Sequence, residues 1–139
     1  MSTATIIVVS ITGVLILFLY FNYRKIKNMP VAADHEKIKI LTTQNFQSQI
    51  KSGVVLVDFW ADWCMPCKMM APVLNSVAND LPSNAAVGKI NIEQYQEMAA
   101  KYNVRSIPTF ILFKNGKEIN RITGGKSKDF LVNLIQKNL

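Results

Sequence analysis

The stretch VVLVDFWADWCMPCK, residues 54–68, contains both cysteines of the chain and decides which fold and chemistry the sequence predicts. Its first part, Val54–Trp60, is an apolar run typical of a buried parallel strand. A helical pattern follows from Lys68 to about Leu81. Cys64 therefore lies where a strand gives way to a helix, and the positive end of a helix dipole favours the reactive thiolate there.

Two cysteines separated by two residues suit three kinds of site. A closed zinc site needs four ligands, usually Cys or His, and this chain offers two cysteines and a distant His35. A structural disulfide across so short a loop removes little entropy from the unfolded chain. We therefore favour a redox-active pair, with no metal and no cofactor.

The run Ala4–Tyr23 contains no charged residue and is rich in Ile, Val, Leu and Phe. Twenty helical residues span about 30 Å, the thickness of the hydrocarbon core of a bilayer. The basic residues Arg24, Lys25 and Lys27 follow this run, whereas a signal peptide carries its positive charge before the apolar region. We expect an uncleaved single-pass anchor with the domain in the cytoplasm, the extracytoplasmic face being the alternative.

The expected domain organisation has three parts: a transmembrane anchor at 1–23, a basic juxtamembrane linker at 24–36 and one globular domain at 37–139. The net charge of +7 comes from 16 Lys and Arg against nine Asp and Glu. The excess beside the span suits an anionic lipid surface. Basic and aromatic residues do not alternate in any cluster, so membrane lipid is an expected partner and nucleic acid is not.

From Ile38 onward, strand and helix patterns alternate in the order β-α-β-α-β-α-β-β-α. Helices between strands predict parallel pairing, and Asn115-Gly116 predicts a hairpin that adds an antiparallel edge. Thr43 is expected to cap the first helix of the domain, and Ser127 the last. The inward face of that last helix is expected to consist of Phe130, Leu131, Leu134 and Ile135.

Four segments of the domain resemble thioredoxins and occur in that family's order: residues 57–68, 89–92, 104–109 and 113–116. The resemblance extends from about Ile38 to Leu139. It implies an α/β thioredoxin fold, in which a central mixed β-sheet is flanked by helices. The N-terminal transmembrane helix is an addition that typical thioredoxins lack.

The resemblance also implies roles in thiol–disulfide exchange. Cys64 would be the nucleophile, with the more exposed sulfur, and Cys67 would resolve the mixed disulfide, so the two form the redox-active disulfide. Asp58 interrupts an apolar strand, and burial should raise its pKa towards a value suited to proton transfer. The family places it beneath Cys67 with Lys89 as its partner, and a purely structural Asp58–Lys89 ion pair is the alternative.

The expected client-binding surface combines residues beside the cysteines with residues of two loops: Trp63, Met65, Pro66, Ile107, Pro108 and Gly124. In the family, the bond before the residue that matches Pro108 is cis, and that loop aligns the incoming chain. Met65 stands where thioredoxins usually have a glycine between the first cysteine and the proline. The sequence therefore does not predict the value of the redox potential. Pro66 is retained and favours a reductase.

These features predict a membrane-tethered thioredoxin-type protein-disulfide reductase. We expect a monomer that acts on disulfide-containing client proteins and is recharged by a thioredoxin reductase or a membrane electron carrier. One alternative is an extracytoplasmic thioredoxin-like protein that supplies reductant to exported thiols or to cytochrome maturation. Another is a scaffolding subunit with dispensable thiols, against which the intact cysteine pair, Asp58 and Lys89 argue.

Overall fold

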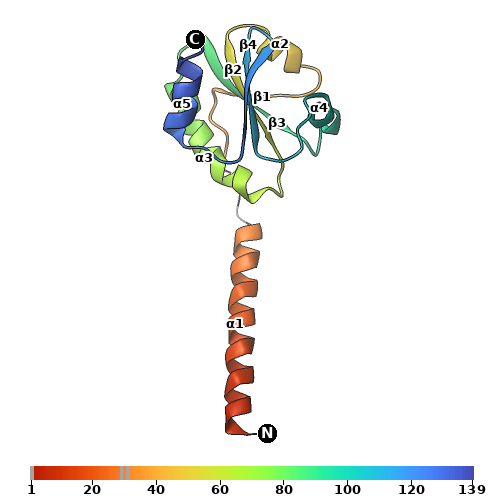
Figure 1. The fold of residues 1–139 in the computed structure, drawn as a ribbon, viewed down its shortest axis with the longest axis vertical. Helices are drawn as coiled ribbons and strands as arrows, with labels where there is room; N and C mark the ends of the chain where they lie inside the picture. The colour runs from red at the N-terminus through yellow and green to blue at the C-terminus, as the bar shows by residue number, and fades with distance from the viewer. Residues whose placement is uncertain (1, 29, 31) are drawn as a thin grey trace. The chain divides into compact units, whose positions relative to one another are not determined.

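The computed structural model describes residues 2–28, 30 and 32–139, so that Met29 and Val31 of the expected linker lie outside the described residues. Contacts between Cα atoms divide the chain into two compact units, with the division after residue 30. The first unit is a single helix, and the second is an α/β domain (Figure 1).

The first unit consists of the helix α1, Thr3–Lys27, and its side chains are exposed throughout Thr3–Lys25. The hydroxyl of Ser10 and the amide of Asn22 each donate a hydrogen bond of 2.9 Å to the carbonyl four residues earlier. These polar groups therefore find partners without water, as a bilayer interior requires. By length and composition α1 suits a membrane span, and a signal sequence near an N-terminus has the same properties.

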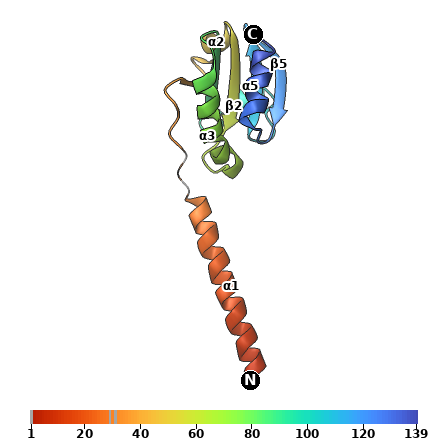
Figure 2. The ribbon, with the colours of Figure 1, turned by 90° about the vertical axis from the view of Figure 1, so that its left-hand side faces the viewer.

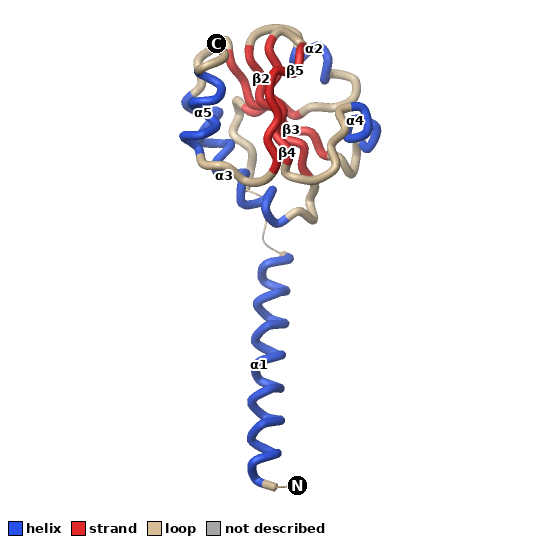
Figure 3. Tube along the Cα trace, viewed as in Figure 1, coloured by secondary structure: helices blue, strands red, loops and turns tan. Residues whose placement is uncertain are grey.

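The second unit is built on a five-stranded mixed sheet with strand order β1-β3-β2-β4-β5. Figure 3 shows its strands in red, with helices in blue on both sides. Strands β1 and β2 both pair parallel with β3, whereas β4 pairs antiparallel with β2 and with β5. The expected mixed α/β sheet is confirmed. The strands are β1 (Ile38–Ile40), β2 (Val54–Trp60), β3 (Ala85–Asn91), β4 (Thr109–Lys114) and β5 (Lys117–Thr123).

The direction of β4 differs from the parallel pairing expected for strands separated by helices. Helix α4, Gln96–Lys101, lies between β3 and β4 and has six residues. A helix between two strands does not by itself fix their relative direction. The five-residue helix α2 (Phe46–Ile50) joins the parallel strands β1 and β2, whereas β4, which follows α4, pairs antiparallel with β2.

Helices α3 and α5 cover one face of the sheet, which Figure 2 shows towards the viewer, and α2 and α4 lie on the other face (Figure 1). Leu56 of β2 packs with Leu74 of α3 and Leu131 of α5, while the next residue, Val57, belongs to the core on the opposite face. Side chains alternate along a strand, so Asp58 points to the face of α3. The remaining helices are α2 (Phe46–Ile50), α3 (Met65–Asp80) and α5 (Lys128–Gln136).

The two expected helix caps differ in outcome. Ser127 caps α5, because its hydroxyl accepts a hydrogen bond of 3.3 Å from the Phe130 amide. The cap assigned to Thr43 is wrong: α2 begins at Phe46, and the Thr43 hydroxyl instead donates to the Glu97 carboxylate. The inward face of α5 is also narrower than expected, since Phe130 is 46% exposed.

Candidate active site

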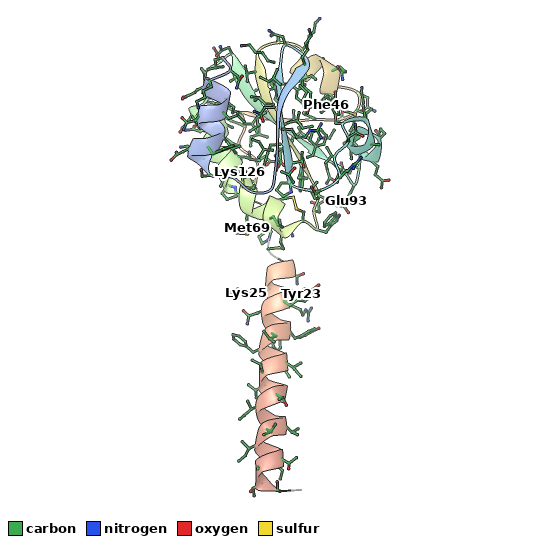
Figure 4. The ribbon with its side chains drawn as sticks, viewed as in Figure 1. Tyr23, Lys25, Phe46, Met69, Glu93 and Lys126 are labelled. Atoms are coloured by element: carbon green, nitrogen blue, oxygen red, sulfur yellow. A yellow bond between two sulfur atoms is a disulfide. The ribbon has the colours of Figure 1, made fainter. Side chains whose placement is uncertain are left out.

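Cys64 and Cys67 form a disulfide at the start of α3, with their Cα atoms 5.3 Å apart (Figure 4). Cys64 is the N-cap of this helix, and its sulfur accepts a hydrogen bond of 3.2 Å from the Cys67 amide. Pro66 lies in the first turn, where the missing N–H would have had no partner within the helix. In the reduced protein this position favours a thiolate on Cys64, because amide donors and the helix dipole stabilise negative charge there.

The expected difference in exposure between the two cysteines is absent from this disulfide-bonded form. Both residues are 3% exposed. The disulfide joins them into one small cluster with Ala61, on which Trp60 and Ile107 pack. The hydrogen bond to the Cys64 sulfur, rather than exposure, is what distinguishes the two thiols.

Asp58 is buried in the middle of β2 with 1% exposure. Its Oδ1 atom accepts no hydrogen bond from any part of the chain that the structure describes. Burial raises the pKa of this carboxyl from 3.8 to about 7, while the positive charge of Lys89 lowers it and the negative charge of Asp34 raises it. A carboxyl with this pKa can accept and release a proton near neutral pH.

Lys89 lies beside Asp58 in the sheet, since the two residues are register partners in the parallel β2–β3 pair. Its ammonium nevertheless forms its ion pair with Asp34, at 2.5 Å, and lies 4.5 Å from the centre of the Trp60 ring. The resemblance implied Lys89 as the partner of Asp58, with a purely structural ion pair between them as the alternative. The structure gives Lys89 a different partner, from the segment that was expected to be linker.

The residues expected to contact client proteins surround the disulfide on two sides. Trp63 is 66% exposed and Pro66 is exposed, while Met65, Ile107 and Gly124 are half-buried. Ile107 packs on the cysteine cluster, and the Ile107–Pro108 bond is cis, although Pro108 itself is buried. The Gly124 amide donates a hydrogen bond of 2.9 Å to the Pro108 carbonyl, which holds these two loops together.

A hydrogen-bond network that the sequence analysis missed ties the active-site turn to the end of β3. The Asn91 amide donates to the Asp62 carboxylate at 3.1 Å, and the Asp62 backbone N–H donates to the Glu93 carboxylate at 3.1 Å. The Glu93 backbone N–H in turn donates to the Asn91 side-chain oxygen at 2.9 Å. These polar residues carry no periodic pattern, so only the fold brings them together.

The described residues contain no group of three or more His, Cys, Asp or Glu side chains that could hold a metal ion. The side chains of this site supply two cysteines that, when reduced, can exchange with a disulfide, and a carboxyl with a pKa of about 7.

Comparison with known proteins agrees with this geometry. The thioredoxin family model matches residues 37–137. A thioredoxin from Chlamydia pneumoniae is 52% identical over 101 residues, which are 73% of this chain and 98% of that protein. One from Staphylococcus epidermidis is 46% identical over 99 residues, or 71% of this chain and 95% of its own length.

Among solved structures, a single-site mutant of a thioredoxin from Halobacterium salinarum superposes with a TM-score of 0.68 at 33% identity. The superposition covers 76% of this chain and 94% of that one. The family match, the fold and the paired cysteines agree, and the chain belongs to the thioredoxin family as a thiol–disulfide oxidoreductase.

Proposed function

We propose that this protein is a membrane-tethered protein-disulfide reductase whose thioredoxin domain faces the cytoplasm. The observation that carries the catalytic part is the position of Cys64, whose sulfur accepts the Cys67 amide at the N-terminus of α3. The exposed Trp63 and Pro66 beside it offer a surface on which a client chain can bind. The tether is supported by α1, with its exposed apolar surface.

The proposed reaction begins when the Cys64 thiolate attacks one sulfur of a client disulfide. A mixed disulfide forms, and the other client sulfur leaves as a thiolate. The buried Asp58 carboxylate then accepts the proton of the Cys67 thiol, and the Cys67 thiolate attacks the Cys64 sulfur. The client leaves with two more electrons as two thiolates; one takes back the proton from Asp58 and the other takes a proton from water, which gives the dithiol. This protein is left with the Cys64–Cys67 disulfide.

Completion of the cycle requires an electron donor, for which we propose a thioredoxin reductase or a membrane electron carrier. The donor reduces the Cys64–Cys67 disulfide by the same exchange in reverse. Clients that lie at the membrane would benefit most, because a tether raises the effective concentration of the domain near them.

Substitution of each cysteine tests the order of attack. We expect Cys67→Ser to accumulate a mixed disulfide with clients, because nothing then displaces the client from Cys64. Cys64→Ser serves as the matched control and should accumulate none. Non-reducing gels of cells that express each variant measure both, and equal accumulation by the two variants would contradict the assignment.

A further inference from the structure

The segment Ala33–Lys37, which we call the docked segment, is hydrogen-bonded along helix α3. The side chain of Asn75 donates to the Ala33 carbonyl and accepts from the His35 amide, both at 2.8 Å. The Lys37 ammonium donates to the Asn79 carbonyl at 3.1 Å. These contacts fix the backbone on both sides of Asp34.

Asp34 extends from the docked segment to Lys89, and their 2.5 Å ion pair is mostly shielded from water. The Lys89 side chain is 3% exposed and that of Asp34 is 26% exposed. A buried ammonium needs a partner, because its desolvation is costly. Asp34 is therefore the ion-pair partner of Lys89. Among the described residues, Lys89 is the only basic group whose charge lowers the pKa of Asp58.

Asp58 is the register neighbour of Lys89, and the charge of Lys89 lowers the pKa of its carboxyl. Its Oδ1 nevertheless has no hydrogen-bond donor among the described residues. Its register partner in β4 is the uncharged Phe110. Lys89 and Asp34 are thus the two charges that bear on the ionisation of Asp58.

We propose that Asp34 is a positioning residue: by pairing with the Lys89 ammonium, it limits the interaction of Lys89 with its register neighbour Asp58. This rests on the proton-transfer role proposed for Asp58. The family match begins at residue 37, three positions beyond Asp34, whereas the docked segment belongs to the same compact unit as the α/β domain. Asp34 is therefore a residue outside the family match that acts on the charges of the site.

The test compares Asp34→Asn with Glu36→Gln in the full-length oxidised protein in detergent micelles. Glu36 is an exposed residue of the same docked segment, so the control removes the same charge. The titration midpoint of the Asp58 carboxyl, followed by carbon-13 NMR, should fall by about one pH unit in Asp34→Asn, because Lys89 becomes available to Asp58. It should stay in place in Glu36→Gln, and Asp34→Glu should restore the original value.

A Lys89→Met background tests whether Asp34 acts through Lys89. Without the ammonium, Asp34→Asn should shift the midpoint by less than half as much, since only direct repulsion remains. An unchanged midpoint in Asp34→Asn, or an equal shift with and without Lys89, would overturn the proposal. The titration midpoint is measured in the absence of turnover. The proton-transfer role of Asp58 is tested separately, by whether Asp58→Asn slows catalysis, so the two proposals can fail independently.

Discussion

Asp58 sets a pH dependence of stability that can be derived from its pKa. Below pH 3.8 the carboxyl is protonated in both the folded and unfolded states, and its burial carries no charge penalty. As pH rises, the unfolded chain releases this proton while the folded protein retains it until about pH 7. This carboxyl therefore lowers the free energy of unfolding progressively through that window, by up to about 4 kcal/mol.

Asp58→Asn should remove this dependence, because the amide does not ionise. We expect the variant to be more stable than the native protein above pH 7 and to show little of the decline between pH 4 and 7. Denaturant titrations of tryptophan fluorescence measure this, since both tryptophans, Trp60 and Trp63, lie in the domain. Glu36→Gln is the control and should keep the native decline, and identical profiles for native protein and Asp58→Asn would refute the expectation.

The sequence revealed Asp58 but not Asp34, and the reason is physical. A carboxylate between Val57 and Phe59 breaks an apolar run, so its burial and raised pKa follow from its neighbours alone. Asp34 stands among polar residues, and its partner Lys89 is 55 positions away. Only the folded chain shows which carboxylate the lysine binds.

At the scale of elements, Gly53 determines how α2 gives way to the central strand β2. Its φ of +73° is costly for residues with a side chain, and a Cβ atom there would lie 2.5 Å from the Asn84 carbonyl oxygen. That oxygen accepts the 3.1 Å hydrogen bond from the Val54 amide that begins β2. Gly53→Ala should therefore cost about 1–3 kcal/mol of stability.

Gly125→Ala is the matched control for this element-scale prediction. A Cβ atom at Gly125 would lie 3.5 Å from the Met70 sulfur, an ordinary contact, and the backbone there is not in the left-handed region. Its stability should be unchanged or slightly raised, because alanine restricts the unfolded chain. Equal losses from both substitutions in fluorescence-monitored denaturation would count against the turn argument.

Elements with strong local signals were predicted well, and those set by tertiary packing were not. The bounds of β2 agree with the sequence because a continuous apolar run is buried on both faces. The Asn115-Gly116 turn follows from residues that adopt positive φ, and both do so here. Phe130 lies on the apolar stripe of α5 yet is 46% exposed, whereas Leu131 and Ile135 are buried and Leu134 packs against the core.

For the whole molecule, the membrane side is the prediction with the widest consequence. Arg24, Lys25 and Lys27 follow the apolar run, so the domain should lie in the cytoplasm. An impermeant thiol reagent added to intact cells after reduction should leave Cys64 and Cys67 unlabelled and should label them after permeabilisation. These are the only thiols of the chain, so the label is unambiguous.

A charge-reversed variant provides the control for this labelling. It carries lysines inserted after Ser2 and neutral residues at 24, 25 and 27, and its domain should become labelled in intact cells. Labelling of the native protein in intact cells would instead place the domain outside and support the extracytoplasmic alternative.

The proposed membrane tether would give the two edges of the sheet a further meaning. Molecules that share a plane meet one another often, and open strand edges invite stacking into aggregates. Here β1 has only three residues, and β5 is lined by Lys117, Glu118 and Arg121, the last two joined by a 2.8 Å ion pair. The register shift between Leu112 and Phe113 adds a local twist beside β5. The short β1 and the charged, twisted β5 thus disfavour edge-to-edge pairing between copies.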